Sequence, residues 1–159
     1  MTLRQAQGGV SRRRGREFTM QILYASEVGG EVLENAADIL AGGEPLLPPE
    51  ARQYGLQLAR TVRMRAGEID RLISGISDHW DLGRLAVVDR IILRMAIAEL
   101  ISEPDVPSSV CINEAVEIAR KFSTENSSRF VNGILDAVAR QLINPPESTP
   151  LESETTESA

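Results

Sequence analysis

The chain has 159 residues, a formal net charge of −6 at pH 7, and 42% apolar but only 4% aromatic residues. This length and composition suit one globular domain with an aliphatic core, and no apolar run approaches the ~18 residues that a membrane-spanning helix needs. The single cysteine excludes an intrachain disulfide, so the sequence predicts a protein of the cytoplasm.

The charge is distributed unevenly along the chain. Residues 1–16 carry five arginines and no acidic residue, whereas residues 144–159 carry four glutamates and no basic residue. We therefore expect a flexible arm over residues 1–10, a single all-helical domain over residues 11–143, and a disordered acidic tail over residues 144–159. A basic segment in an acidic chain keeps a nucleic-acid partner open.

Apolar residues recur at helical spacing, and no run of four or more residues alternates as a strand would. The first helix is expected to start at Ser11, as its N-cap, and to end at the "GG" pair of residues 29–30. Further helices are expected at about 31–41, 49–65, 67–78, 85–101 and 108–122, with a short one in "HWDLGRL" and a last one between "STENSS" and "NPP". The predicted fold is all-α, a bundle of about seven helices.

Residues suited to catalysis or metal binding are scarce. His79 is the only histidine and Cys111 the only cysteine, so a zinc site or a Ser–His–Asp or Cys–His set lacks the residues it needs. We interpret His79 as a corner residue and Cys111 as a small buried one. The only lysine, Lys121, does not end a Gly-rich loop, which excludes a P-loop. No catalytic residue, metal or cofactor is expected, and the protein is not predicted to be an enzyme.

An arginine cluster stands where the first helix is expected to begin. It consists of Arg12, Arg13, Arg14 and Arg16. The positive end of a helix dipole disfavours cations unless an anion is bound, and an RNA phosphate would supply one. A solvated helix start is the alternative interpretation.

The second cluster surrounds the turn "STENSS". Its polar and basic members are Arg120, Lys121, Ser123, Asn126, Ser127 and Arg129, with Phe122 and Phe130 interleaved. Basic residues and aromatic rings at a turn can hold single-stranded RNA by phosphate contacts and base stacking. In the alternative interpretation the rings anchor the core, which suits Phe122 on the apolar stripe of its helix, and the polar residues cap helices.

Three stretches, "RRRGREFTMQILY", "WDLGRLAVVDRIILRMAIAEL" and "DVPSSVCINEAVEIARKFSTENSSRFVNGILD", resemble the NusB family of transcription antitermination factors over about residues 11–140. The resemblance implies a fold of two small helical subdomains. It also implies a non-catalytic adaptor that binds single-stranded boxA RNA of rRNA operon leaders together with NusE, a small-subunit ribosomal protein. This pair would join the RNA polymerase elongation complex with other Nus factors. Some family members form homodimers, so a second copy is a candidate partner.

The resemblance also implies the site residues. RNA would be held by Arg12, Arg13, Arg14, Arg16, Lys121, Ser123, Asn126, Ser127, Arg129 and Phe130. NusE would dock on a face with Tyr24 and Asp89, to which Glu99 adds a charge complementary to a basic partner. Asn126 stands where relatives often have aspartate, and the missing acid should favour RNA binding or leave it unchanged.

Three polar or small residues receive a structural interpretation. Asn113 and Asn132 are expected to form hydrogen bonds across facing helices or to backbone. Gly133 predicts a close helix–helix contact, because a glycine inside a helix costs about 1 kcal/mol relative to alanine.

Two other functions stay open. One is a protein scaffold without direct RNA binding; the other is a helix-turn-helix DNA-binding regulator over residues 85–122, against which Glu114 and Glu117 would repel phosphate.

Overall fold

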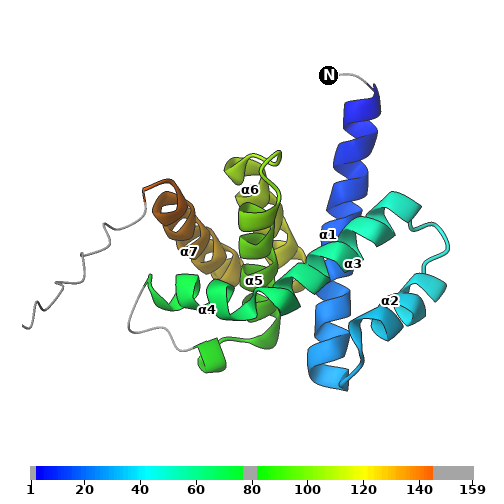
Figure 1. Cartoon of the computed structure of the whole chain (residues 1–159), viewed down its shortest axis with the longest axis horizontal. Helices are drawn as coiled ribbons and strands as arrows, with labels where there is room; N and C mark the ends of the chain where they lie inside the picture. The colour runs from blue at the N-terminus through cyan, green and yellow to red at the C-terminus, as the bar shows by residue number, and fades with distance from the viewer. Residues whose placement is uncertain (1–2, 77–81, 145–159) are drawn as a thin grey trace, which may run out of the picture.

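The computed structural model describes residues 3–76 and 82–144 (Figure 1). Its elements are α1 (Leu3–Gly29), α2 (Leu33–Gly42), α3 (Pro49–Met64), α4 (Ala66–Ser74), the 3₁₀ helix η1 (Leu82–Arg84), α5 (Val87–Ser102), α6 (Ser108–Phe122) and α7 (Glu125–Ile143). The described ranges contain no strand, which confirms the all-α prediction. The expectations for His79 and for the acidic tail beyond Asn144 lie outside the described residues.

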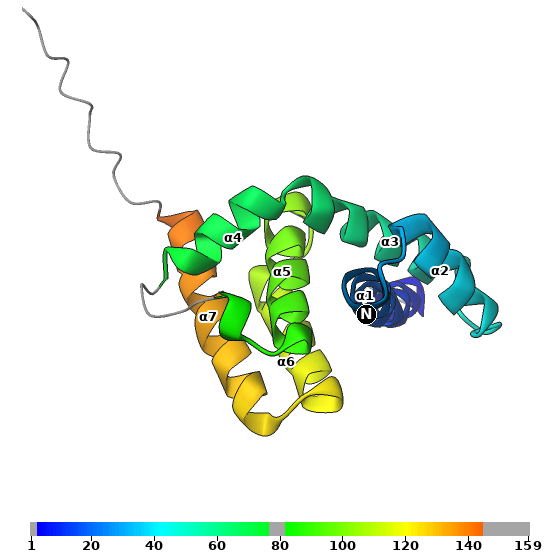
Figure 2. The same cartoon turned by 90° about the horizontal axis from the view of Figure 1, so that it is seen from below.

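The helices form two groups, as the predicted pair of subdomains requires. α1, α2 and α3 pack against one another on one side, and α6 and α7 form an antiparallel hairpin on the other (Figures 1 and 2). α5 lies between the groups and contacts α1, α3, α6 and α7. None of the described helices combines the length and apolarity needed to cross a bilayer.

The core is aliphatic and centres on α5. Its residues Ile91, Ile92, Leu93 and Ile97 are each at most 1% exposed, and α1 contributes Phe18 at 1%. Residues 95–99 of α5 are all buried, so neighbouring helices cover this stretch on every side. Each fully buried side chain of this kind stabilises the fold by about 1.5–3 kcal/mol.

Two glycines set the separation between α1 and α3. A Cβ atom added to Gly55 would lie 2.7 Å from the Gly15 carbonyl oxygen and 2.9 Å from Phe18, and one added to Gly15 would lie 3.1 Å from the Ala51 carbonyl oxygen. The Thr19 hydroxyl lies 2.9 Å from the carbonyl oxygen of Gly15 and 3.0 Å from that of Gly55. This close crossing fixes α1, and therefore its arginines, against the rest of the molecule.

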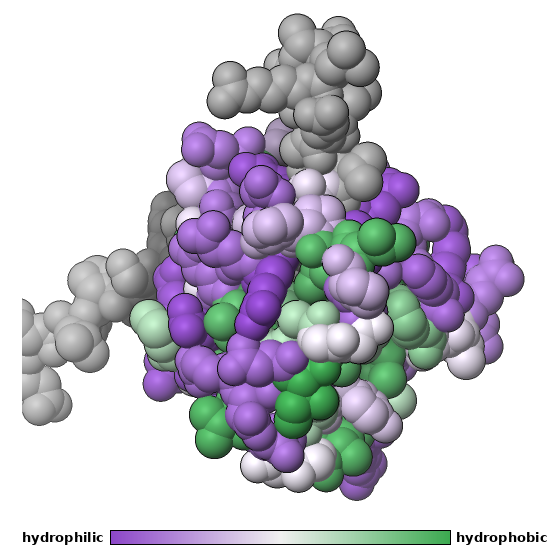
Figure 3. Space-filling view, turned by 90° about the vertical axis from the view of Figure 1, so that its right-hand side faces the viewer, coloured by the Kyte–Doolittle hydropathy of each residue, from purple (hydrophilic) through white to green (hydrophobic). Residues whose placement is uncertain are grey.

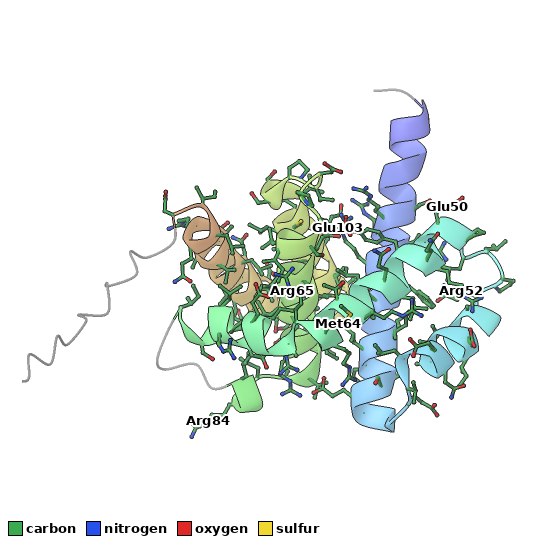
Figure 4. The ribbon with its side chains drawn as sticks, viewed as in Figure 1. Glu50, Arg52, Met64, Arg65, Arg84 and Glu103 are labelled. Carbon is green, nitrogen blue, oxygen red and sulfur yellow. The ribbon has the colours of Figure 1, made fainter. Side chains whose placement is uncertain are left out.

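Polar contacts join neighbouring helices at the surface. Arg52 on α3 pairs with Asp38 on α2. At the α3–α4 junction, Arg65 donates to both Glu68 oxygens at 2.8 Å and to the Ile101 carbonyl of α5 at 3.3 Å. Figure 4 labels Arg52 and Arg65 at the two ends of α3.

Two sequence-based expectations about α1 and α7 are wrong. α1 begins at Leu3, so Ser11 lies inside the helix and is not its N-cap. A Cβ atom at Gly133 would meet nothing within 4 Å, so no close helix contact explains that glycine. The predicted end of α1 is confirmed, because Gly30 has φ 73 and its N–H bonds to the Ser26 carbonyl.

Candidate nucleic-acid interface

The arginine cluster lies within α1 and not at its start. Arg12 follows Leu3 by about two and a half helical turns, beyond the first turn where the helix dipole acts. The dipole argument for a bound phosphate is therefore wrong. Arg12 and Arg13 are nevertheless exposed, and Arg14 is half-buried. Accessibility, and not the helix terminus, is what makes Arg12 and Arg13 candidates for phosphate contacts.

Arg16 and Glu99 are buried and bind each other. Arg16 is 4% exposed and Glu99 1%. The Arg16 Nε atom lies 2.9 Å from both Glu99 oxygens, and the Tyr54 hydroxyl also donates to Glu99. Neither charge is presented to solvent, so the predicted roles of Arg16 in RNA binding and of Glu99 in NusE binding are corrected here. A buried pair of this kind needs its full set of hydrogen bonds to offset desolvation.

The buried Glu99 carboxylate contributes to raising the pKa of two neighbouring side chains, Tyr54 and Cys111. Burial, and then the hydrogen bond to Glu99, raise the pKa of Tyr54 well above its usual range. Burial, followed by the Glu99 charge, raises the pKa of Cys111 to about 12. Cys111 is 1% exposed and neutral at pH 7, which confirms its interpretation as a small buried residue.

Ion pairs bring the two predicted RNA-binding segments together. Arg13 on α1 donates to both Glu114 oxygens on α6, at 3.1 and 2.9 Å, and Glu114 raises the pKa of Arg13. Lys121 at the end of α6 donates to Glu17 on α1 at 3.0 Å. Segments about a hundred positions apart in sequence thus share one surface.

Arg14 also has an acidic neighbour, since it lies 3.2 Å from Glu44. Arg12 instead lies over the Tyr54 ring at 5.6 Å from its centroid, a cation–π contact. Arg12 therefore adds a positive charge to this surface, and within residues 3–76 and 82–144 no carboxylate forms an ion pair with it.

Asp89 is an internal acid. It is 7% exposed, and its carboxylate oxygens accept hydrogen bonds from the hydroxyl groups of Ser123 and Ser127, with an oxygen–oxygen distance of 2.8 Å in each. Thr124 caps α7 by accepting from the Ser127 N–H at 3.1 Å. The prediction that Asp89 faces NusE is corrected, and Ser123 and Ser127 turn their hydroxyls toward the protein and not toward RNA.

The environments of the two phenylalanines differ from those expected: Phe122 was expected in the core and is exposed, whereas Phe130 was expected to contact RNA and is partly buried. Phe122 is 36% exposed, with the Lys121 Nζ atom 5.3 Å from its ring centroid. Phe130, which was predicted to contact RNA, is partly buried and packs against the core. Phe122 ends α6, so its position on the apolar stripe does not bury it; its place next to "STENSS" is the signal that could have identified it.

Asn126 and Arg129 are exposed at the start of α7, and Arg129 lies 3.8 Å from Glu125. We use "basic surface" for Arg12, Arg13, Lys121 and Phe122.

The α5–α6 pair does not present a free recognition helix, because α5 is central and Glu114 is bound to Arg13. The helix-turn-helix alternative therefore lacks support.

Tyr24 is exposed at 43% on α1. Other exposed apolar residues of α1, α2, α3 and the connection before α2 are Val28, Val32, Ile39 and Met64. Figure 3 looks onto the side of the molecule where α1, α2 and α3 lie, and it shows apolar side chains gathered among polar ones. Such a surface suits a protein partner.

Residues 13–140 match the family model described as the NusB family. The transcription antitermination protein NusB of Geobacter sulfurreducens is 44% identical over 133 residues, covering 83% of this chain and 96% of the relative. That of Geotalea daltonii is 42% identical over 142 residues, with the same coverages of 83% and 96%. That of Chloroherpeton thalassium is 40% identical over 133 residues, and this chain spans 63% of its length.

Solved structures agree with these relatives. NusB of T. maritima has a TM-score of 0.75 at 39% identity, covering 82% of this chain and 91% of that chain. A chain from a structure of the antitermination factors NusB and NusE in complex with dsRNA has a TM-score of 0.71 at 26% identity, covering 82% and 96%.

Proposed function

The chain belongs to the NusB family, and from this premise we propose that it is a transcription antitermination factor that binds RNA together with NusE. The RNA is single-stranded boxA of rRNA operon leaders, and the pair joins the RNA polymerase elongation complex with other Nus factors. The role is that of an adaptor that holds RNA and a protein, without making or breaking a covalent bond.

The observation that carries this proposal is the union of two basic segments on one surface. The Arg13–Glu114 and Lys121–Glu17 pairs both bridge α1 and α6, and they place Arg13 and Lys121 on the same surface. Phosphates can replace these carboxylates, because an arginine binds both anions through the same pair of N–H groups. The exposed Phe122 ring beside Lys121 supplies a stacking surface for a base.

The test is a binding titration of boxA RNA and a scrambled RNA, with and without NusE, over a range of salt concentrations. With about three phosphate contacts, log K is expected to fall against log salt with a slope of roughly −2, and Arg13→Ala should reduce that slope by about 0.7. Arg60→Ala is the matched control, since Arg60 is exposed and bound to a glutamate on a different face.

A protein scaffold without direct RNA contact is the second candidate. It is favoured by the acidic partners of Arg13, Arg14 and Lys121, which already neutralise much of the basic surface. Salt-independent binding, with equal affinities for boxA and scrambled RNA, would support the scaffold and overturn RNA binding.

A further inference from the structure

The hairpin of α6 and α7 carries a polar groove outside the basic surface. Its volume is about 300 Å³, and its lining includes Asn113, Glu117 and Arg120 of α6 and Arg129 and Asn132 of α7. Arg120, which lines the groove, is followed by Lys121 of the basic surface, so the groove and the basic surface meet at the same end of α6. It is therefore within reach of an RNA strand held there.

Two carboxamides face this groove without intramolecular partners. Asn113 and Asn132 are exposed, and neither side chain has a hydrogen-bond partner among the residues that the structure describes. The expected bond across the helices is therefore absent between them. Asparagine is a poor helix former, because its side chain competes for backbone hydrogen bonds. Neither residue caps a helix, so no hydrogen bond among the described residues accounts for an asparagine at either position.

Gly133 adds a third residue of the same kind. It is exposed next to Asn132, one turn after Arg129, and a Cβ atom there would meet nothing within 4 Å. Glycine inside a helix is unfavourable, and here neither packing nor a positive φ requires it. It leaves the α7 backbone uncovered directly after Asn132, which lines the groove.

The electrostatics of the groove favour a neutral group over a phosphate. Arg120 lies 2.5 Å from Glu117, and Arg129 lies 3.8 Å from Glu125, so each arginine has a carboxylate on its own helix. The amides supply both donors and acceptors. Asparagine bonds in this way to the edge of a base, adenine above all, and an unpaired strand leaves that edge accessible.

We propose that this groove holds one nucleobase of the bound RNA, read by the carboxamides of Asn113 and Asn132. The proposal rests on the proposed function, because the basic surface must first hold the strand. It assigns base discrimination to the α6–α7 groove and phosphate binding to Arg12, Arg13 and Lys121.

The experiment uses the full chain with NusE and compares Asn113→Ala, Asn132→Ala and the double variant. The probes are boxA RNA, a series with one base replaced at each position, and scrambled RNA. We expect each single variant to bind boxA roughly 5- to 150-fold more weakly, the range for losing one good amide–base pair. Binding of scrambled RNA and the salt slope should be unchanged, and discrimination should disappear at one RNA position.

Alanine is the better helix former, so the variants should keep their thermal stability. Gln57→Ala, an exposed amide on α3, is the matched control. A second approach is Gly133→Gln, which covers the open backbone and should weaken boxA binding without loss of stability.

The outcomes separate this inference from the proposed function. Unchanged boxA affinity and base discrimination in all three asparagine variants, alongside salt-dependent binding by the wild type, overturns the groove and leaves the proposed function intact. Loss of NusE binding with unchanged boxA discrimination assigns the groove to a protein and also overturns it. Absence of RNA binding by the wild-type chain with NusE overturns the proposed function itself.

Discussion

The carboxylate of Asp89 holds the α6–α7 turn through two serine hydroxyls. Asp89→Ala leaves both hydroxyls without that acceptor, which is expected to destabilise the fold by about 1–3 kcal/mol. In a protein of this size Tm should fall by roughly 3–10 °C, measured by circular dichroism. Asp105→Ala, at an exposed position in the α5–α6 connection, is the control and should change stability by less than about 0.5 kcal/mol. An unchanged Tm for Asp89→Ala would contradict an internal role.

Gly55 and Gly133 should respond oppositely to alanine. Gly55→Ala places a Cβ atom 2.7 Å from the Gly15 carbonyl oxygen, so α1 and α3 must separate, at a cost of about 1–3 kcal/mol. Gly133→Ala meets open space and should stabilise α7 by up to about 1 kcal/mol. Urea unfolding measures both, and a destabilised Gly133→Ala would contradict this account.

The pKa of Cys111 predicts a loss of stability at alkaline pH. Its value rises from 9.0 to about 12 on folding, so below pH 9 both states keep the thiol proton and the contribution is constant. Above pH 9 the unfolded state loses the proton first, so the free energy of unfolding falls as pH rises toward 12. Tyr54, with its raised pKa, acts in the same direction.

Cys111→Ala should reduce the part of the alkaline slope that Cys111 contributes, as measured by urea unfolding between pH 8 and about 11. Iodoacetamide supplies an independent check, because it should modify the native thiol slowly at pH 8 and the unfolded thiol rapidly. Equal rates in the two states would contradict burial.

Single residues were the hardest to predict from sequence. Phe122 and Phe130 share a motif, and only the end of α6 at Phe122 decides which ring reaches solvent. Arg16 resembles its neighbours in "RRRGR", yet its position on α1 turns it toward Glu99 on α5. Such assignments depend on contacts between distant segments, which a local pattern does not contain.

At the scale of elements, α1 joins the two proposed binding surfaces. Arg13 and Tyr24 are 11 positions apart, which places them on the same face of the helix and about 16 Å apart along its axis. Glu17 lies between them and binds Lys121. One rigid helix thus presents the proposed RNA contact and the proposed NusE contact in a fixed order.

Glu17 should compete with RNA for Lys121. Glu17→Gln removes that competing carboxylate and is expected to increase boxA affinity about two- to fivefold, as loss of a weak exposed ion pair allows. Filter binding at low salt measures the effect. Glu34→Gln, which breaks the Arg60 pair elsewhere, should leave affinity unchanged. Weaker RNA binding by Glu17→Gln would mean that the pair positions Lys121 for RNA.

Helix locations followed from apolar periodicity, because each amphipathic stripe is a local pattern. The start of α1 did not, since the segment before Ser11 lacks an apolar stripe and yet continues the helix from Leu3. The end at Gly30 was predictable, because a positive φ favours glycine.

For the whole molecule, two partners are proposed on two parts of one body. Tyr24→Ala should weaken NusE binding and leave the binding of RNA alone unchanged, whereas Arg13→Ala should do the reverse. Calorimetry with each partner separately measures this, and Tm should stay within a few degrees for both exposed positions. A parallel loss of both activities in either variant would contradict separate surfaces.

The all-α class could be predicted from the whole sequence because every strong apolar pattern had the helical period. The placement of the acids could not. Asp89 and Glu99 were expected at a charged surface, yet the fold uses them to hold the α6–α7 turn and Arg16. Net charge describes how the protein attracts partners, and it does not show which charges remain available.

The Arg16–Glu99 pair also has a consequence for synthesis on the ribosome. The two residues are 83 positions apart. At about 5–20 residues per second, α1 leaves the peptidyl-transferase centre roughly 4–17 s before the residue that neutralises its buried guanidinium. Until then the apolar face of α1, with Phe18 and Ile22, lacks α5 to cover it. Packing of α1 is therefore completed only after most of the chain has been made.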